Sequence, residues 1–376
     1  MKINRVNYRS YCGYRSIRTD VMQFMNRFQI TILFMLVPLS ALQIYAQPGG
    51  YYTYAFMNLT NSARVASLGG KVVSVWDDDL NLPFHNPSLL NDSMSGHLVI
   101  NYINYFSDIN YGYVSCSGNY ENIGNFAAGL HYINYGKFTA ADRTGIVTGE
   151  FTASEYALNL IWSRSIDSLF RIGVNIKPVY SVLESYQSVG LLADAGITYV
   201  NRKGLFSAGL VFRNFGTQLK AYHDSNREPV PFEILLGISQ KLEHAPFRFF
   251  VTAHNLQKPD MRYQDREKSG RELDPVSGEA IQENRLEAFG DGLMRHMIFG
   301  VELIPLKHFY LRAGYNYQRR KEMMISTNVA MVGFSWGFGL KISRFHISYG
   351  RAAYHLAGAS NHFSLSTDLS TFLPSL

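Results

Sequence analysis

Apolar and polar residues alternate along most of the chain from about residue 97 onwards. Between Phe309 and Gln318, aromatic and aliphatic residues occupy every second position, and the positions between them are mostly glycine, amide or charged residues. The same period of two recurs at 170–177, 332–342 and 362–369. In a β-strand this period places the apolar side chains on one face and the polar side chains on the other. The pattern therefore predicts strands with one apolar face and one small or polar face.

Fourteen such segments can be placed along the chain. They are predicted near 97–107, 110–120, 123–135, 154–165, 169–182, 188–200, 204–215, 230–242, 246–256, 293–304, 308–318, 329–342, 344–355 and 361–372. The connections after even-numbered strands are short, whereas those after odd-numbered strands include the long segments 136–153, 216–229, 257–292 and 319–328. Outer-membrane barrels have short periplasmic turns and longer extracellular loops, so short and long connections alternate along the chain. A soluble β-sandwich does not require this alternation. We therefore predict an all-β fold, a fourteen-stranded antiparallel transmembrane β-barrel over residues 97–376.

Composition agrees with this fold class. Aromatic residues make up 14% of the chain and charged residues 17%, which argues against both disorder and a helical fold. A mean hydropathy of -0.09 excludes a protein with many membrane-spanning helices, since each would need about 20 apolar residues. Only alternate residues of a barrel strand face lipid, so a barrel wall keeps the mean hydropathy near zero.

The longest connection, 257–292, contains six basic and nine acidic residues and almost no aromatic ones. This composition is typical of a solvated loop. If the protein binds a partner outside the cell, this loop is the first candidate for the contact.

Residues 1–46 have the pattern of a secretory signal peptide. A basic stretch precedes the apolar run 28–42, which contains Pro38 and is followed by Ala46. We expect cleavage after Ala46, with a signal anchor as the alternative. The chain has 35 basic and 29 acidic residues, and this leader holds six of the basic residues and one acidic residue. The remainder is nearly neutral, so nucleic acid is not an expected partner. Cys116 is then the only cysteine, which excludes an intrachain disulfide.

Residues 47–96 do not alternate, and they contain Gly69-Gly70, the acidic run Asp77 to Asp79, and His85-Asn86-Pro87. We predict turns and short helices at or inside the periplasmic mouth of the barrel, forming a plug-like segment. A sharper hypothesis is that the three aspartates pair with the inward basic residues Arg171, Lys177, Arg312 and Lys341.

The chemical motifs in the chain favour no enzyme, cofactor or metal site. Residues 333–337 match the G-x-S-x-G nucleophile motif around Ser335, but alternation runs straight through it, which indicates a strand instead of the required strand–turn–helix. A serine hydrolase that uses His346, His355 or His362 remains the minor alternative. The histidines lack zinc-site spacing, and Gly69-Gly70-Lys71 lacks the Ser or Thr that completes a nucleotide-binding loop.

Several short motifs resemble a known family. They are Ser62 to Gly70, Asp77 to Asp79 and Asn86 to Leu90 near the start, and 337–341, 348–350 and 362–366 near the end. This set resembles the PorQ family, outer-membrane components of the type IX secretion system of Bacteroidota. With its PorV relatives, that family is similar to FadL-like fourteen-stranded transporters, whose Asn-Pro-Ala motif corresponds to Asn86-Pro87-Ser88. The resemblance implies a non-enzymatic outer-membrane anchor or scaffold for a surface attachment-complex partner similar to PorZ. The alternative is FadL-like transport of hydrophobic solutes.

Overall fold

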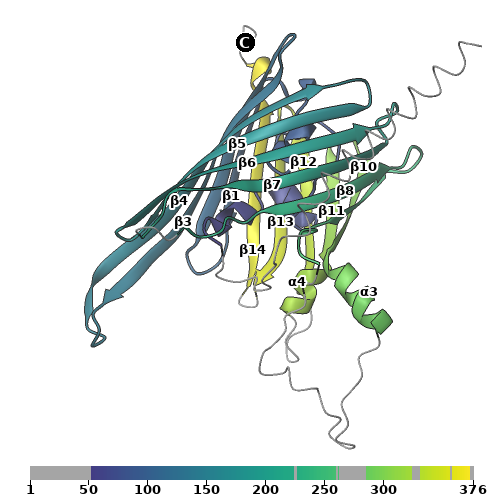
Figure 1. Ribbon diagram of the computed structural model, residues 1–376. Helices are drawn as coiled ribbons and strands as arrows, with labels where there is room; N and C mark the ends of the chain where they lie inside the picture. Colours follow the sequence, from purple (N-terminus) through teal and green to yellow (C-terminus); the bar gives the residue numbers. More distant parts are fainter. Residues whose placement is uncertain are drawn as a thin grey trace, which may run out of the picture. The chain divides into compact units, whose positions relative to one another are not determined.

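Fourteen antiparallel strands pair in sequence order and close into a barrel (Figure 1). The first strand, β1 (His97–Asn104), pairs with β2 (Asn110–Tyr120) and also with the last strand, β14 (Gly358–Asp368). The sheet therefore has no edge strand. This arrangement confirms the predicted fold class. The other strands are β3 (Gly124–Ala141), β4 (Val147–Ser165), β5 (Phe170–Leu183), β6 (Tyr186–Val200), β7 (Phe206–Lys220), β8 (Glu233–Lys241), β9 (Phe247–Ala253), β10 (Met297–Leu306), β11 (Phe309–Asn316), β12 (Phe334–Ile342) and β13 (Phe345–His355).

The computed structural model describes residues 52–223, 227–259, 261, 285–323, 331–355 and 358–372. The expected signal peptide, 1–46, and most of the connection 257–292 lie outside the described residues. Residues Gln47–Leu376 form one compact unit. Within the described parts of the chain, no helix is long and apolar enough to cross a membrane.

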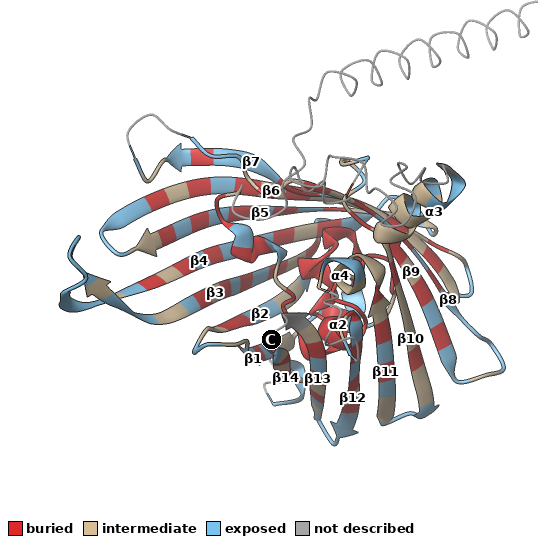
Figure 2. Cartoon of the chain, turned by 90° about the horizontal axis from the view of Figure 1, so that it is seen from below, coloured by how far each residue is buried: buried red, intermediate tan, exposed pale blue. Residues whose placement is uncertain are grey.

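Most outward side chains of the strands are apolar, and most of the buried inward ones are polar. Figure 2 shows the alternation of buried and exposed positions along the strands. On β11, Leu311 is 41% exposed, whereas the neighbouring Arg312 is 4% exposed. The same inversion holds on β1 for Ile100 and Asn101. In water, each half-exposed aliphatic side chain would lack about 1 kcal/mol of the free energy that full burial contributes to stability. An apolar medium around the barrel removes that cost.

The two ends of the barrel differ. Connections 121–123, 166–169, 201–205, 242–246, 307–308 and 343–344 lie at one end, here named the inner rim. The opposite end, the outer rim, carries the longer connections 221–232, 254–296 and 317–333. The prediction that the connections after even-numbered strands are short is therefore correct. The predicted loop 136–153 is wrong, because β3 and β4 continue as a hairpin to Ala141 and Val147.

Two helices stand at the outer rim. The first, α3 (Arg285–Arg295), precedes β10, and the second, α4 (Tyr317–Glu322), follows β11. The predictions that strands begin at 293 and continue through 318 are therefore wrong at these ends. Asn316 caps α4 by accepting a hydrogen bond from the Arg319 amide at 3.0 Å, and this turns the chain out of the extended conformation.

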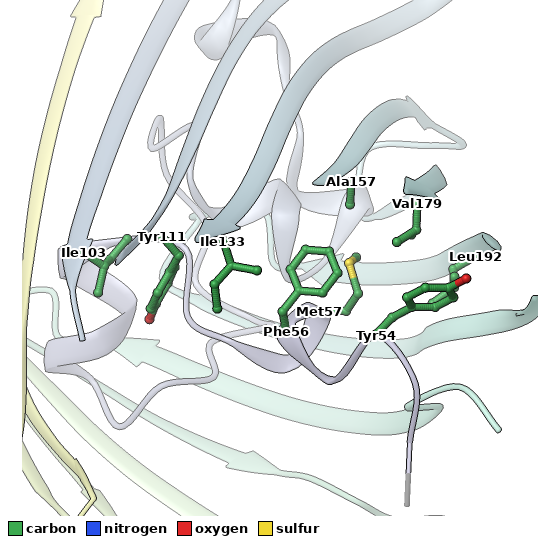
Figure 3. Packing of buried hydrophobic residues seen from close by; sticks show 9 residues of the cluster. All are labelled: Tyr54, Phe56, Met57, Ile103, Tyr111, Ile133, Ala157, Val179 and Leu192. Carbon is green, nitrogen blue, oxygen red and sulfur yellow. The ribbon is translucent and has the colours of Figure 1, made fainter. Parts of the chain in front are cut away.

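Residues 52–96 fill the lumen as a plug. Its elements are η2 (Ala55–Asn58), α2 (Ala63–Ser67), η3 (Leu82–Phe84), η4 (Pro87–Leu89) and η5 (Asp92–Met94). Phe56 and Met57 pack against inward residues of the wall such as Ile133, forming one of the buried clusters (Figure 3). A second cluster surrounds Phe84. Apolar packing in this barrel is therefore concentrated where the plug meets the wall.

Candidate functional site

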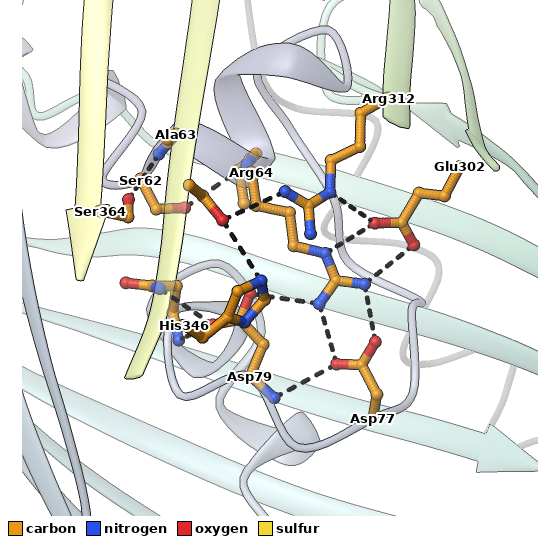
Figure 4. Close-up of polar contacts among 12 residues, drawn as sticks. Ser62, Ala63, Arg64, Asp77, Asp79, Glu302, Arg312, His346 and Ser364 are labelled. Carbon is orange, nitrogen blue, oxygen red and sulfur yellow. Dashed lines mark hydrogen bonds and ion pairs between the residues drawn. The ribbon is translucent and has the colours of Figure 1, made fainter. Parts of the chain in front are cut away.

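Six charged side chains form a network between the plug and the wall near the inner rim. Figure 4 labels Arg64, Asp77, Asp79, Glu302 and Arg312 of this network. At its centre, Arg64 of α2 donates two hydrogen bonds to Asp77, of 2.6 and 3.0 Å, and two to Glu302 of β10, both of 2.9 Å. A fifth bond, of 3.1 Å, reaches Asp79. All five guanidinium donors are thus used.

Two further arginines complete the charge balance of this network. Arg248 of β9 contacts Asp77 at 2.7 Å and Glu302 at 2.8 Å, and Arg312 of β11 contacts Glu302 at 3.0 Å. Three arginines therefore face three carboxylates. Burial on its own would raise the pKa of Asp77, but Arg64 and Arg248 outweigh it and lower that pKa well below its usual range. The network stays ionised and joins the plug to three strands.

The hypothesis that the aspartates form ion pairs is correct for Asp77 and Asp79, but the predicted partners are wrong. Asp77 and Asp79 form ion pairs, yet their partners are Arg64 and Arg248. Lys177 instead contacts Asp194 at 2.5 Å, inside the wall. Arg171 lies over the ring of Trp76, 4.1 Å from its centroid. Arg312 reaches the network only through Glu302, and Lys341 is exposed at the inner rim.

The sequence does carry a signal for the two wall residues that were missed. Arg248 and Glu302 are charged residues at inward positions of strands whose flanking residues are apolar. A charged side chain that is buried in a strand needs a partner of opposite charge. Each of these two positions therefore predicts such a partner. Their mutual proximity comes from the pairing of β9 with β10, which places Arg248 opposite Glu302.

The Asn86-Pro87-Ser88 motif attaches the plug to another part of the wall. Asn86 is fully buried, and its amide nitrogen donates hydrogen bonds to the Val73 carbonyl at 2.7 Å and to Thr198 of β6 at 3.0 Å. Its oxygen accepts bonds from the Ser88 amide and hydroxyl. A Cβ on Gly196 of β6 would lie 2.2 Å from this oxygen. The glycine therefore permits the close approach of the motif.

A second ion pair lies between the plug and β8. Lys71 contacts Glu233, whose other neighbour is His254 at 3.6 Å. The lysine of Gly69-Gly70-Lys71 is thus used in plug attachment and not in phosphate binding. Within the described residues, no group of three His, Cys, Asp or Glu side chains is arranged to hold a metal ion.

Ser335 is also part of the plug attachment. It lies on β12 and is 3% exposed. Its hydroxyl donates to the Ser67 carbonyl and accepts from the Gly69 amide, both at 3.0 Å. The chain continues straight through it as a strand, so the sharp turn that a nucleophile motif requires is absent here.

Two cavities open near the inner rim on either side of the Asp77–Asp78 corner. The larger, of about 700 Å³, is lined by the charge network and by Lys241, Lys307 and Lys341. The smaller, of about 440 Å³, is lined mainly by polar residues, with Trp76 as its aromatic side. Most of the residues that line them are charged or polar, whereas a hydrophobic ligand needs a mainly apolar lining.

The distal part of the β3–β4 hairpin, residues 137–151, extends past the neighbouring strands at the outer rim; it is here named the ribbon (Figure 1). β3 pairs with β2 only up to Asn134, and β4 pairs with β5 only from Ala153. All residues of the ribbon are exposed or half-exposed. Ile146 and Val147 are each 65% exposed, and Phe138 stacks on Phe151 with centroids 5.1 Å apart.

Solved structures similar to this chain are transporters and porins. The toluene transporter TodX of Pseudomonas putida is 13% identical with a TM-score of 0.45, and the match covers 82% of this chain and 96% of TodX. A FadL homologue of Pseudomonas aeruginosa is 10% identical with a TM-score of 0.44, covering 82% and 98%. The KdgM porin is 6% identical with a TM-score of 0.31, covering 72% and 98%. No protein-family model and no curated protein matches the sequence. The fold assignment therefore rests on this chain's own strand order and register.

Proposed function

We propose that the chain is a plugged outer-membrane barrel that anchors a surface partner in type IX secretion. The membrane location is supported by the apolar outward faces of the strands, such as those of Leu311 and Ile100. The long connections and the ribbon then lie outside the cell. A lumen occupied by a plug that is ion-paired to several strands favours a scaffold over an open channel.

The structure of the ribbon is the observation that best supports the scaffold role. An isolated two-stranded hairpin is only marginally stable in water, and this one exposes large apolar side chains at Phe138, Ile146 and Val147. Neither of its edges is paired with another strand of the described chain. Unpaired strand edges with apolar side chains bind partners by adding a strand. We therefore assign partner binding to residues 137–151.

The type IX assignment and the PorZ-like partner derive from the sequence resemblance. The motifs that carry it, Ser62 to Gly70, Asp77 to Asp79 and Asn86 to Leu90, are among the plug segments that contact the wall. A shared motif set of this kind supports a shared plug architecture. The role in secretion follows if that architecture serves the same purpose.

The proposal is tested by changing the apolar residues of the ribbon. In a Phe138→Ser, Ile146→Ser, Val147→Ser variant, we expect the surface partner to be lost from affinity purifications of detergent-solubilised outer membrane. Surface retention of secreted cargo should fall with it. The matched control changes polar residues of the same ribbon, Thr139→Ser, Thr144→Ser and Thr148→Ser, and should retain both. Equal partner recovery with both variants would contradict the proposal.

The alternative is a channel for hydrophobic solutes. The apolar cluster around Phe56 and Met57 in the lumen is the observation that favours it, because a rearranged plug would turn this cluster into an apolar pocket. Uptake of a labelled monoaromatic hydrocarbon separates the two functions. The scaffold predicts uptake equal to that of cells lacking the chain, whereas uptake that depends on the chain would favour the channel.

A further inference from the structure

Helix α3 has exposed apolar side chains at the outer rim. Leu286 is 80% exposed, Phe289 is 72% exposed and Leu293 is 49% exposed. They follow one another at intervals of three and four residues and therefore share one face of the helix. Figures 1 and 2 show α3 beside the β9–β10 side of the wall, pointing away from the lumen.

The opposite face of α3 is attached to α4. Asp291 accepts a hydrogen bond from the Tyr317 hydroxyl at 2.7 Å, lies 3.4 Å from Lys321, and pairs with Arg295 at 2.7 Å. At about 100° per residue, Asp291 lies roughly 200° from both Phe289 and Leu293. These contacts therefore turn the apolar face away from α4.

The helix ends close to the apolar outer surface of the barrel. Arg295 is two residues before Met297, the first residue of β10. Met297 pairs with Ala253, which in turn pairs with Leu236, an outward residue that is 46% exposed. The C-terminal half of α3 therefore continues the apolar belt of the wall.

The small size of this surface decides between lipid and protein as its occupant. An aromatic side chain buries at most about 150–250 Å² and a leucine less, whereas a specific protein interface buries about 800 Å² on each partner. Three partly exposed side chains, only one of them aromatic, fall short of the area that a protein partner needs. A helix already held by the barrel needs no large area to enter an adjoining lipid interface.

We propose that Phe289 and Leu293 insert into the outer leaflet of the membrane, so that α3 is an interfacial anchor beside the β9–β10 wall. This inference rests on the proposed membrane location. It gives α3 a lipid contact, and leaves the ribbon as the protein-binding element of the outer rim.

Spin-label accessibility in reconstituted bilayers tests the proposal. Labels are placed at single cysteines, Phe289→Cys and Leu293→Cys, in full-length protein carrying Cys12→Ser and Cys116→Ser. Phe334→Cys, on the outward face of β12, is the lipid reference, and Thr144→Cys in the ribbon is the solvent reference. Heat resistance of each labelled protein confirms that the barrel is folded.

We expect the ratio of oxygen to nickel-chelate collisions at 289 and 293 to be several-fold higher than at 144 and to approach that at 334. A solvent-like ratio at 289 and 293 with a lipid-like ratio at 334 would overturn the inference while leaving the membrane barrel intact. Protection of 289 only in native membranes that contain a protein partner would overturn it too. A solvent-like ratio at 334 would instead contradict the membrane location itself.

Discussion

At the scale of single residues, Arg64 shows how this barrel accommodates a charge in its lumen. The side chain is 7% exposed, and each guanidinium hydrogen is directed at a carboxylate. Burying an ion is favourable only when such partners replace its water. Because the partners come from both plug and wall, the same contacts that satisfy the charge also fix the position of α2.

Removing the Arg64 charge should destabilise the plug. Arg64→Met leaves three carboxylates facing two arginines and takes away the ion-pair partner of Asp79, and we expect a loss of about 3–5 kcal/mol in the free energy of unfolding. Denaturant unfolding in detergent measures it. A double variant that adds Glu302→Gln restores the charge balance and should lose less. An equal loss in both variants would show that the packing of Arg64, and not its charge, matters.

Acid should weaken the plug through His85, which is fully buried and bonded to Asn61 at 2.8 Å. Burial, and after it the cations Arg213, Lys177 and Lys71, hold the pKa of His85 well below its ordinary value. The unfolded chain therefore takes up a proton at higher pH than the folded chain does. Stability should be complete above about pH 6.5, the pKa of an exposed histidine, and should fall as the pH decreases below it.

Thermal unfolding at a series of pH values between 7.5 and 5 checks this expectation. His85→Gln keeps an amide donor for Asn61 but does not titrate, so its unfolding temperature should depend less on pH over the same range. A pH dependence as steep as that of the unchanged protein would exclude His85 as the source.

Adding one methyl group to the wall at Gly196 should disturb the Asn86 contact. Its Cβ would lie 2.2 Å from the Asn86 side-chain oxygen, which is held by buried partners. We expect Gly196→Ala to lower the free energy of unfolding by roughly 1–3 kcal/mol. Gly118 provides a matched control, because a Cβ there meets no atom within 4 Å. Unfolding curves of Gly118→Ala should match those of the unchanged protein, and the same result for Gly196→Ala would contradict the close approach.

At the scale of elements, sequence periodicity identified all fourteen strands, because each has one face against the lumen and one against an apolar medium. It failed at 136–153, where both faces of the hairpin are exposed and the residues have no reason to alternate. The prediction of a strand from residue 293 is also wrong at its start, because Leu293 and Met294 belong to α3. The plug contacts of Arg248 and Glu302 could not be predicted in the same way, since they depend on which strand is adjacent in space.

Removing the ribbon should leave the barrel intact. A variant in which Asn-Gly replaces residues 137–151 loses only exposed or half-exposed side chains, and we expect an unchanged unfolding temperature. A similar excision of 178–191, the end of β5 and the start of β6, removes the buried, lumen-facing Val179 and Ser188 and should lower the unfolding temperature. A large loss of stability without the ribbon would mean that these residues support the wall.

At the scale of the whole molecule, the lumen is occupied and the two rims are unlike. The plug contacts β9 to β13 through the charge network and α2, and β5 to β7 through Asn86 and its neighbours. The plug is therefore attached to opposite sides of the barrel wall. The inner rim is short and charged, whereas the outer rim extends into the ribbon and the two helices.

This arrangement predicts a nearly closed barrel. In planar lipid bilayers, we expect currents through the unchanged protein to stay close to baseline. Arg64→Ala combined with Arg248→Ala removes the positive side of the network, and should produce longer or larger openings. Steady, porin-like conductance of the unchanged protein would contradict a fixed plug.

The most direct test of the barrel uses two of the three tryptophans. Trp336 lies on β12 and is 44% exposed on the outer surface, whereas Trp76 lies in the plug beneath Arg171. In bilayers whose acyl chains carry bromine, fluorescence of a variant that retains only Trp336 should be strongly quenched, and that of a variant that retains only Trp76 should not. Quenching of Trp76 alone, or of neither, would mean that the apolar face of the strands does not contact lipid.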